Sequence, residues 1–260
     1  MSHRPRKRFG QNFLHDPAVI GRIIATISPS GSEQLVEIGP GQGAITLPLL
    51  QQAGRLSVVE LDRDLVGPLQ ARCADLGELI VYNADALRFD FCKLAETAPL
   101  RIIGNLPYNI STPLLFHLLA QHDCIHDMHF MLQKEVVERM AATPGSRQYG
   151  RLSVMLQYRC KVTHLFNIGP GAFSPPPKIK SAFVRLEPYA HPPVQVIDEG
   201  VFEQLVRQAF SQRRKTLRNA LHGMLEAEAI SALGIDPAAR AETLAVGDFA
   251  TLANRVATAG

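Results

Sequence analysis

The stretch Val36-Glu-Ile-Gly39-Pro-Gly41-Gln-Gly43 decides the fold, because it joins an apolar segment to a glycine loop that opens a helix. Glycine adopts backbone conformations that other residues avoid, so this loop can turn tightly and approach a ligand closely. Main-chain N–H groups at the start of the helix can then point at that ligand. By itself the pattern indicates a βα unit, and ligand binding needs further support, since many glycine turns only connect β to α.

Apolar and helical segments alternate around this loop. Such alternation predicts right-handed crossovers, a parallel sheet covered on both faces, and a ligand beyond the carboxyl ends of the strands. The predicted strands are 35–38, 56–61, 79–82, 101–104 and 128–132; the predicted helices are 45–52, 65–73, 87–95 and 113–120, after a first helix that begins at Pro17 with Asp16 as its N-cap.

The pattern changes after Gln133. We expect a helix over 134–141, a helix or a strand over 152–159, and an antiparallel edge pair from 162–168 and 181–186 around a Pro/Gly-rich loop. Prolines 188, 192 and 193 mark a linker, and the amphipathic stretches 201–210, 216–225 and 248–256 beyond it carry no strand signal. We therefore predict one domain over residues 1–190 and a small all-helical domain over 191–260.

Composition excludes several classes of protein. The chain has 260 residues, of which 46% are hydrophobic and 20% charged, as expected for a soluble protein with a packed core. No apolar run approaches the length of a membrane span, and no apolar export segment follows the basic N-terminus, so we expect no membrane partner and a cytoplasmic protein. The four cysteines form no Cys-x-x-Cys pair, which favours reduced thiols over a disulfide framework or a zinc site.

Positive charge is concentrated at two places, although the net charge is only +3. The clusters are Arg4, Arg6, Lys7 and Arg8 near one end and Arg213, Arg214, Lys215 and Arg218 near the other. Such clusters can bind a polyanion by releasing its condensed counterions. Taken alone, they are more typical of solvated surface charge than of a binding site.

Acidic residues follow the second and third predicted strands. Glu60 lies 21 positions after Gly39, where a dinucleotide fold places an acid that binds ribose hydroxyls, and Asp85 follows the next strand. Each alone could be an ordinary helix N-cap. A nicotinamide cofactor and S-adenosylmethionine both carry a ribose, but this loop is not Gly-x-Gly-x-x-Gly and no arginine lies near it. S-adenosylmethionine, a sulfonium cation without phosphate, is therefore favoured.

The fourth strand is predicted to end in Gly104-Asn105-Leu106-Pro107-Tyr108-Asn109. An adenine N6 amine is a poor nucleophile until its nitrogen becomes more tetrahedral. The amide oxygen of Asn105 and a neighbouring main-chain carbonyl, at Leu106, can accept its two hydrogens and aim its lone pair at a methyl donor. Pro107 stiffens the turn and Tyr108 can stack on the purine.

This motif resembles the Asn-Leu-Pro-Tyr form found in the bacterial ribosomal RNA adenine N6,N6-dimethyltransferases. The resemblance extends over almost the whole chain, through Gln11–Leu14, Glu37–Gly41, Glu60–Asp62, Asp85, Met131–Glu135, Tyr149–Ser153, Phe173–Lys178 and Gln212–Thr216. It implies a class I (Rossmann-like) methyltransferase with a doubly wound α/β sheet, and S-adenosylmethionine as cofactor. The implied substrate is a pair of adjacent adenosines in the 3′-terminal hairpin loop of 16S rRNA, within an immature 30S subunit.

The resemblance also implies roles for individual residues. The expected catalytic residues are Asn105, Leu106, Tyr108 and Phe173, and the expected cofactor-binding residues are Asn12, Leu14, Gly39, Glu60, Asp85 and Asn105. Phe173 would stack on the second face of the target base; the alternative is a hydrophobic plug under a loop. The basic clusters would contact rRNA phosphates.

Two other functions remain open at this stage. One is methylation of 23S rRNA, and the other is a non-catalytic rRNA-binding assembly factor. The histidines at 122, 126 and 129 have neither the spacing nor the chemistry of a metal site, so no metal is expected. No heptad or apolar patch demands a dimer, and we expect a monomer.

Overall fold

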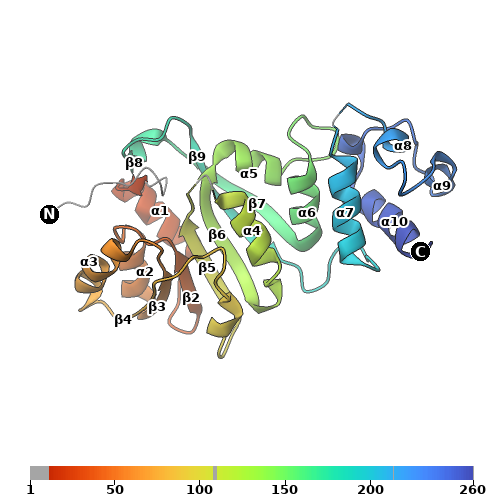
Figure 1. Cartoon of the computed structure of the whole chain (residues 1–260). Helices are drawn as coiled ribbons and strands as arrows, with labels where there is room; N and C mark the ends of the chain where they lie inside the picture. The colour runs from red at the N-terminus through yellow and green to blue at the C-terminus, as the bar shows by residue number, and fades with distance from the viewer. Residues whose placement is uncertain (1–11, 108–109, 213, 260) are drawn as a thin grey trace. The chain divides into compact units, whose positions relative to one another are not determined.

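The computed structural model describes residues 12–107, 110–212 and 214–259 (Figure 1). The chain divides into two compact units at Val137, Val162 and Pro188: the described residues up to Val137 and Thr163–Pro188 form the first, and Glu138–Val162 with the described residues from Tyr189 onward form the second. The second segment of the second unit begins at Tyr189, close to the boundary that we predicted at residue 190. The structure also assigns residues 138–162 to the second unit, whereas the sequence pattern grouped them with the first domain.

The first unit is built around a seven-stranded sheet, whose strand order is β4-β3-β2-β5-β6-β9-β7 (Figure 1). Its strands are β2 (Gln34–Ile38), β3 (Arg55–Val59), β4 (Glu78–Tyr82), β5 (Leu100–Asn105), β6 (Ile125–Gln133), β7 (Cys160–Ile168) and β9 (Ser181–Pro188). Strands β2 to β6 pair in parallel, and β9 is antiparallel to β6. From β2 the chain winds outward to β3 and β4, then returns to β5 on the other side. The predicted doubly wound α/β fold is confirmed, with its topological switch between β2 and β5.

The helices of this unit follow the predicted pattern with one exception. They are α1 (Pro17–Ile27), α2 (Thr46–Ala53), α3 (Arg63–Cys73), α4 (Ser111–Leu119) and α5 (Lys134–Met140), of which the last crosses the unit boundary. Asp16 caps α1 by accepting the N–H groups of Ala18 and Val19, and Ile23, Ile24 and Ile27 of that helix are buried in the core. Within the described ranges, no helix has the length and apolar character of a membrane span.

The helix predicted over 87–95 is wrong. Only η2 (Phe91–Leu94), a short 3₁₀ turn, forms there. The side chain of Asp85 accepts the N–H of Leu87 (3.0 Å), and the side chain of Gln121 accepts the N–H of Phe91 (2.7 Å). Main-chain N–H groups of this segment therefore bond to side chains. In a continuous helix, the N–H of Phe91 would bond to a main-chain carbonyl one turn earlier.

The expectation of four reduced thiols is also wrong, because Cys92 and Cys124 form a disulfide in this structure. They are 32 positions apart in the sequence, but η2 and η3 (His122–Cys124) bring their Cα atoms to 5.4 Å. Cys73 and Cys160 are free and buried. A spacing rule for cysteines misses this pair because its partners meet only through the fold.

Helices form most of the second unit. They are α6 (Arg151–Arg159), α7 (Glu199–Ala209), α8 (Leu217–Ala220), α9 (Ala227–Ala232) and α10 (Val246–Ala257). The ambiguous stretch 152–159 is thus a helix, and its Val154 and Tyr158 share a core with Phe202 and Phe249. The helix predicted over 216–225 is shorter than expected, because the N–H of Leu217 bonds to the carbonyl of Ala239 and the chain turns after α8.

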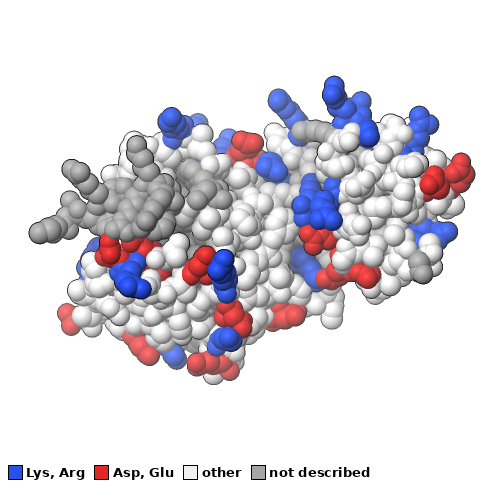
Figure 2. All heavy atoms as spheres, in the orientation of Figure 1, with Lys and Arg blue, Asp and Glu red and all other residues white. Residues whose placement is uncertain are grey.

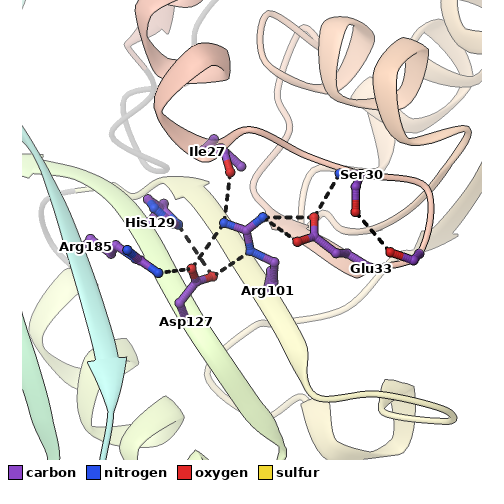
Figure 3. A network of polar contacts seen from close by, with 8 residues as sticks. Ile27, Ser30, Glu33, Arg101, Asp127, His129 and Arg185 are labelled. Atoms are coloured by element: carbon purple, nitrogen blue, oxygen red, sulfur yellow. Dashed lines mark hydrogen bonds and ion pairs between the residues drawn. The ribbon is translucent and has the colours of Figure 1, made fainter.

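Figure 3 shows a buried ion network at the amino ends of the central strands. Arg101 of β5 donates from Nε and Nη2 to the Asp127 carboxylate at 3.0 and 3.2 Å, and from Nη1 to both Glu33 oxygens at 2.9 Å. Its Nη2 also bonds to the carbonyl of Ile27, at the end of α1 (2.9 Å). Arg185 of β9 donates to Asp127 at 3.1 Å. The network therefore ties α1 to β5, β6 and β9.

Replacement of Asp127 by asparagine is expected to lower the free energy of unfolding by about 3–5 kcal/mol at pH 7, because it leaves the buried Arg101 charge short of an acid. Burial favours the neutral acid, but the hydrogen bonds from Arg101, together with the positive charges of Arg101, Arg185 and His129, hold the pKa of Asp127 below its ordinary value. The contribution should accordingly be present near neutral pH and disappear as pH falls through that lowered pKa. Urea denaturation measures it. The control is Glu78→Gln, at the exposed Arg55–Glu78 pair, which should shift stability by under about 1 kcal/mol.

The disulfide leads to a prediction about the number of cysteines that react with an alkylating reagent. Under denaturing conditions without reductant, an alkylating reagent should label two cysteines, Cys73 and Cys160, and with reductant it should label four. The Cys92→Ser variant should give three labels either way. In the chain-entropy model, reduction should lower the free energy of unfolding by about 3–4 kcal/mol, since the bond closes a loop of some thirty residues. Four labels without reductant would contradict the cross-link.

Candidate functional site

A cavity of about 340 Å³ lies at the carboxyl ends of β2, β3 and β5. This volume is within the roughly 300–1,000 Å³ typical of small-molecule sites. The residues predicted to bind the cofactor all line it, namely Asn12, Leu14, Gly39, Glu60, Asp85 and Asn105, and so does Leu106. The structure thus brings together side chains that are separated by more than ninety positions in the sequence, at the switch point of the sheet.

The glycine loop forms one side of the cavity. Gly39, Gly41 and Gly43 all have positive φ angles, of 66°, 56° and 81°. A Cβ atom at Gly43 would lie 2.6 Å from a methyl carbon of Leu47 and 2.7 Å from one of Leu69. The loop therefore needs glycine at this position, both for its backbone conformation and for its packing against α2 and α3.

The Glu60 carboxylate connects β3 to this loop. One oxygen accepts the N–H of Gly41 at 3.1 Å, and the other accepts the N–H of Asp62 at 2.7 Å. Burial raises the pKa of Glu60, although these main-chain hydrogen bonds act in the opposite direction. A carboxylate has about four acceptor positions, so Glu60 retains capacity to accept hydroxyl groups of a ligand.

Asp85 occupies the adjacent position beyond β4. Its Oδ1 accepts the N–H of Leu87 at 3.0 Å, which orients the carboxyl group at the edge of the cavity. Asn83 donates to the main-chain carbonyl of Glu60 at 2.8 Å and so links the ends of β3 and β4. Both acids therefore have partial local roles, as in the N-cap alternative, while still lining the cavity.

Glu37 is a functional candidate that the sequence reasoning missed. It lies on β2, lines the cavity, is 2% exposed, and accepts a 2.6 Å hydrogen bond from the hydroxyl of Thr46. Burial raises its pKa to about 8, and the nearby Glu60 charge acts in the same direction. The carboxyl group is therefore largely protonated at neutral pH. The signal available in the sequence was an acid inside an otherwise apolar strand.

Asn105 ends β5 with its amide group at the cavity. Its Nδ2 donates to the main-chain carbonyl of Asn12 at 3.1 Å. This bond fixes the orientation of the carboxamide and leaves its oxygen as an acceptor. The N–H of Leu106 bonds to the carbonyl of Met131 at 3.2 Å, so the turn after Asn105 is anchored to β6. Tyr108 lies outside the described residues.

The N-terminal segment that meets Asn105 is held by a short strand pair that the sequence did not predict. Strand β1 (Phe13–Leu14) is antiparallel to β8 (Phe173–Ser174), with Leu14 opposite Phe173. Phe173 is 3% exposed, packs in the core, and is absent from the cavity lining. The structure therefore places its ring where the hydrophobic-plug alternative puts it, and base stacking by Phe173 stays a prediction.

The charge of the cavity defines the ligand that it suits. Four acids line it, Glu37, Glu60, Asp62 and Asp85, and its described lining contains no lysine or arginine. Such a site disfavours a pyrophosphate and favours a ligand with hydroxyl donors and positive charge. These acceptor groups therefore fit an adenosine that carries a sulfonium and an ammonium group. No group of three or more potential metal ligands occurs in the described parts of the chain.

Comparison with known proteins gives consistent matches. The family model described as ribosomal RNA adenine dimethylase matches residues 2–258. Ribosomal RNA small subunit methyltransferase A from Pseudomonas aeruginosa is 56% identical over 256 residues, which cover 98% of this chain and 96% of the relative. The protein of the same name from Chromohalobacter salexigens is 55% identical, with 98% and 93% covered.

Two solved structures are similar over most of their length. A dimethyladenosine transferase from Plasmodium falciparum has a TM-score of 0.77 and 26% identity, covering 92% of this chain and 95% of that one. The 23S rRNA methyltransferase ErmE has a TM-score of 0.75 and 24% identity, covering 95% and 100%. The second similarity shows the fold alone.

Glu37 generates a prediction about pH dependence. Because its pKa is about 8 in the folded chain and near 4.5 when exposed, unfolding releases a proton between these values, and stability should fall as pH rises through this window. Glu37→Gln keeps an acceptor for Thr46 but does not titrate. It should raise the free energy of unfolding at pH 8 by on the order of 2–4 kcal/mol and change it little at pH 4.5. Urea denaturation of the cofactor-free protein at both pH values measures this. A variant that is no more stable than the parent at pH 8 would contradict the raised pKa.

Proposed function

This chain belongs to the ribosomal RNA adenine dimethylase family, and on that premise we propose that it forms N6,N6-dimethyladenosine at two adjacent adenosines of the 3′-terminal hairpin loop of 16S rRNA. Membership confirms the resemblance drawn from the sequence motifs. The methyl donor is S-adenosylmethionine. We further propose that the substrate is the immature 30S subunit and that the chain acts as a monomer in the cytoplasm.

One observation carries the proposal. A carboxamide of fixed orientation, that of Asn105, lies at the rim of a cavity whose acids suit a cationic adenosine. A ligand held in that cavity and a base held at Asn105 are brought together as two reactants of one transfer. Positioning of this kind supplies much of the rate in reactions between two bound groups.

The chain's own residues account for donor binding as follows. Glu60 accepts the ribose hydroxyls with the acceptor positions that Gly41 and Asp62 leave free. Asp85 accepts from the adenine amine. Asn12, Leu14 and Gly39 border the methionine end, where the acids of the cavity attract positive charge.

The transfer itself requires orientation of the acceptor amine. The bound donor supplies an electrophilic methyl carbon on sulfur. Asn105 Oδ1 and the main-chain carbonyl of Leu106 accept the two N6 hydrogens, so that the nitrogen lone pair points toward the cavity. The described lining offers no strong base, and none is needed, because the methylated nitrogen is acidic and loses its proton to water.

RNA binding needs positive charge outside the cavity. Lys and Arg side chains lie at the surface of both units (Figure 2). In the second unit Arg214, Lys215 and Arg218 are exposed, and we propose that they contact rRNA phosphates. Arg213 and the N-terminal cluster Arg4–Arg8, which we expect to do the same, lie outside the described residues. The target adenosine must be unpaired or extruded to reach Asn105.

Two alternatives are separated by substrate. ErmE, named as a 23S rRNA methyltransferase, has a similar fold, and the fold alone does not distinguish the two substrates. The names of relatives at 55–56% identity favour the small subunit. A non-catalytic assembly factor has no need for an oriented carboxamide beside a donor cavity, and the intact site disfavours it.

Asn105→Ala is expected to reduce methyl transfer by about 100-fold or more, because it removes an acceptor aligned with the reacting amine. Affinity for the donor analogue sinefungin should stay within about tenfold, since most donor contacts remain. Transfer of radiolabelled methyl groups to under-methylated 30S particles, followed by nucleoside analysis, measures the first quantity, and calorimetry measures the second. Gln52→Ala, which removes an exposed carboxamide on α2, is the matched control.

Activity of the Asn105→Ala variant within tenfold of the parent would refute the role of the amide. Naked 23S rRNA serves as a second substrate in the same assay. Methylation of that RNA but not of 30S particles would support the 23S alternative, and no methylation of either RNA by the parent would support the assembly factor.

A further inference from the structure

A second cleft, of about 470 Å³, opens beside the cofactor cavity at the end of β4. We call it the β4 cleft. It shares Ala84 and Asp85 with the cavity, so the two sites have a common border. Its lining is completed by Tyr82, Arg88, Phe89, Asp90, Lys93 and Leu94.

Aromatic rings form the apolar part of the β4 cleft. The ring centroids of Tyr82 and Phe89 lie 5.3 Å apart, and Phe89 packs edge-on against the fully buried Phe91 at 5.0 Å. Tyr82 and Phe89 themselves are half-buried, so part of each ring faces the cleft. Half-buried aromatic rings that are supported by a buried ring are suited to contact with a flat aromatic ligand.

Positive charge borders the same rings. Arg88 is exposed, and its guanidinium has no hydrogen-bond or ion-pair partner among the described residues. Neither acid of the cleft pairs with Arg88: Asp90 lies 3.5 Å from Lys93, and Asp85 accepts the N–H of Leu87 at the border with the cofactor cavity. Arg88 is therefore the group available to an anion, and a planar guanidinium matches a phosphate well.

The segment that carries Arg88 and Phe89 is fixed in place without any ligand. Gln121 accepts the N–H of Phe91 at 2.7 Å, and the ring of His117 contacts the carbonyl of Phe89 at 2.8 Å. The Cys92–Cys124 bond ties η2 to the same region. A preformed cleft binds without the cost of ordering its own residues.

We propose that the β4 cleft is a subsite for one unpaired nucleotide of the RNA substrate, with its base against Tyr82 and Phe89 and its phosphate at Arg88. The choice of RNA as the source of that nucleotide rests on the proposed function. The two neighbouring sites suit different ligands. The cavity is lined by acids and suits the cationic donor, whereas the β4 cleft combines aromatic rings with a free arginine and suits an anionic nucleotide.

Two variants of the full chain test the proposal, with sinefungin at saturation so that the cavity is filled. Arg88→Gln removes the charge, and Tyr82→Leu removes a ring while keeping apolar bulk. Arg55→Gln is the matched control, because Arg55 is an exposed arginine of the same unit at the opposite end of the strands. The probe is a short single-stranded oligoadenylate that carries a photo-crosslinking base, with adenosine 5′-monophosphate as a second probe.

Arg88→Gln should weaken oligoadenylate binding by about 3–10-fold at moderate salt and reduce the logarithmic salt slope by about 0.7, the value for one phosphate contact to a single strand. Tyr82→Leu should weaken binding by about fivefold or more, as expected for a lost base–aromatic contact. Crosslinks should map to the segment 82–94. Sinefungin affinity should change by less than twofold in both variants, and unchanged thermal unfolding of Arg88→Gln would show that its fold is intact.

Oligoadenylate affinity and salt slope in both variants equal to those of Arg55→Gln would overturn the proposal. So would binding of adenosine 5′-monophosphate at this cleft that oligoadenylate does not displace, since the source would then be a free nucleotide. These binding measurements require no methyl transfer. Loss of the proposed activity with the predicted binding pattern retained would therefore refute the function and leave the subsite standing.

Discussion

The Glu60 carboxylate is the constraint on which the site depends. Its two oxygens accept main-chain N–H groups from the glycine loop after β2 and from the start of α3, so one side chain sets the spacing of two strand ends. The group is 6% exposed, and burial raises its pKa, so its ionised form relies on these hydrogen bonds. A ligand that adds hydroxyl donors completes the set. The cavity thus has its shape before any ligand binds, and ligand binding relieves an electrostatic cost that the fold already carries.

Charged side chains are paired at the amino ends of the parallel strands but not at their carboxyl ends. At the amino ends, Arg101 and Arg185 meet Asp127 and Glu33, and every charge has an opposite partner. Such a network fixes strands and has little left to offer a ligand. At the carboxyl ends, Glu60 and Asp85 accept hydrogen bonds from main-chain N–H groups and meet no lysine or arginine among the described residues, and Glu37 is held as a largely neutral acid. The uncompensated acids define where a cationic ligand is attracted.

The sequence predictions that the structure confirms depend on local sequence patterns. The five parallel strands are short apolar runs, and the glycine loop and the acids after β3 and β4 follow them directly, so strand ends and site residues could be predicted together. The failures required knowledge of contacts between distant segments. Gln121 accepts a main-chain N–H at Phe91, the fold brings Cys92 to Cys124, and β1 pairs with β8 from the far end of the first unit's sequence. The raised pKa of Glu37 likewise depends on burial by residues from several elements, which no spacing in the sequence encodes.

The pairing of β1 with β8 links the alignment of Asn105 to the position of Phe173. Asn12, next to β1, supplies the carbonyl that orients the Asn105 carboxamide, and Leu14 lies opposite Phe173 in the strand pair. A shift of the pairing by one residue would turn Leu14 out of the core and displace the Asn12 carbonyl. Any movement of β8 that brought the Phe173 ring to a base would therefore also act on the carboxamide. The orientation of the Asn105 carboxamide and the position of Phe173 thus both depend on one strand pair, which the motif at 105–108 does not encode.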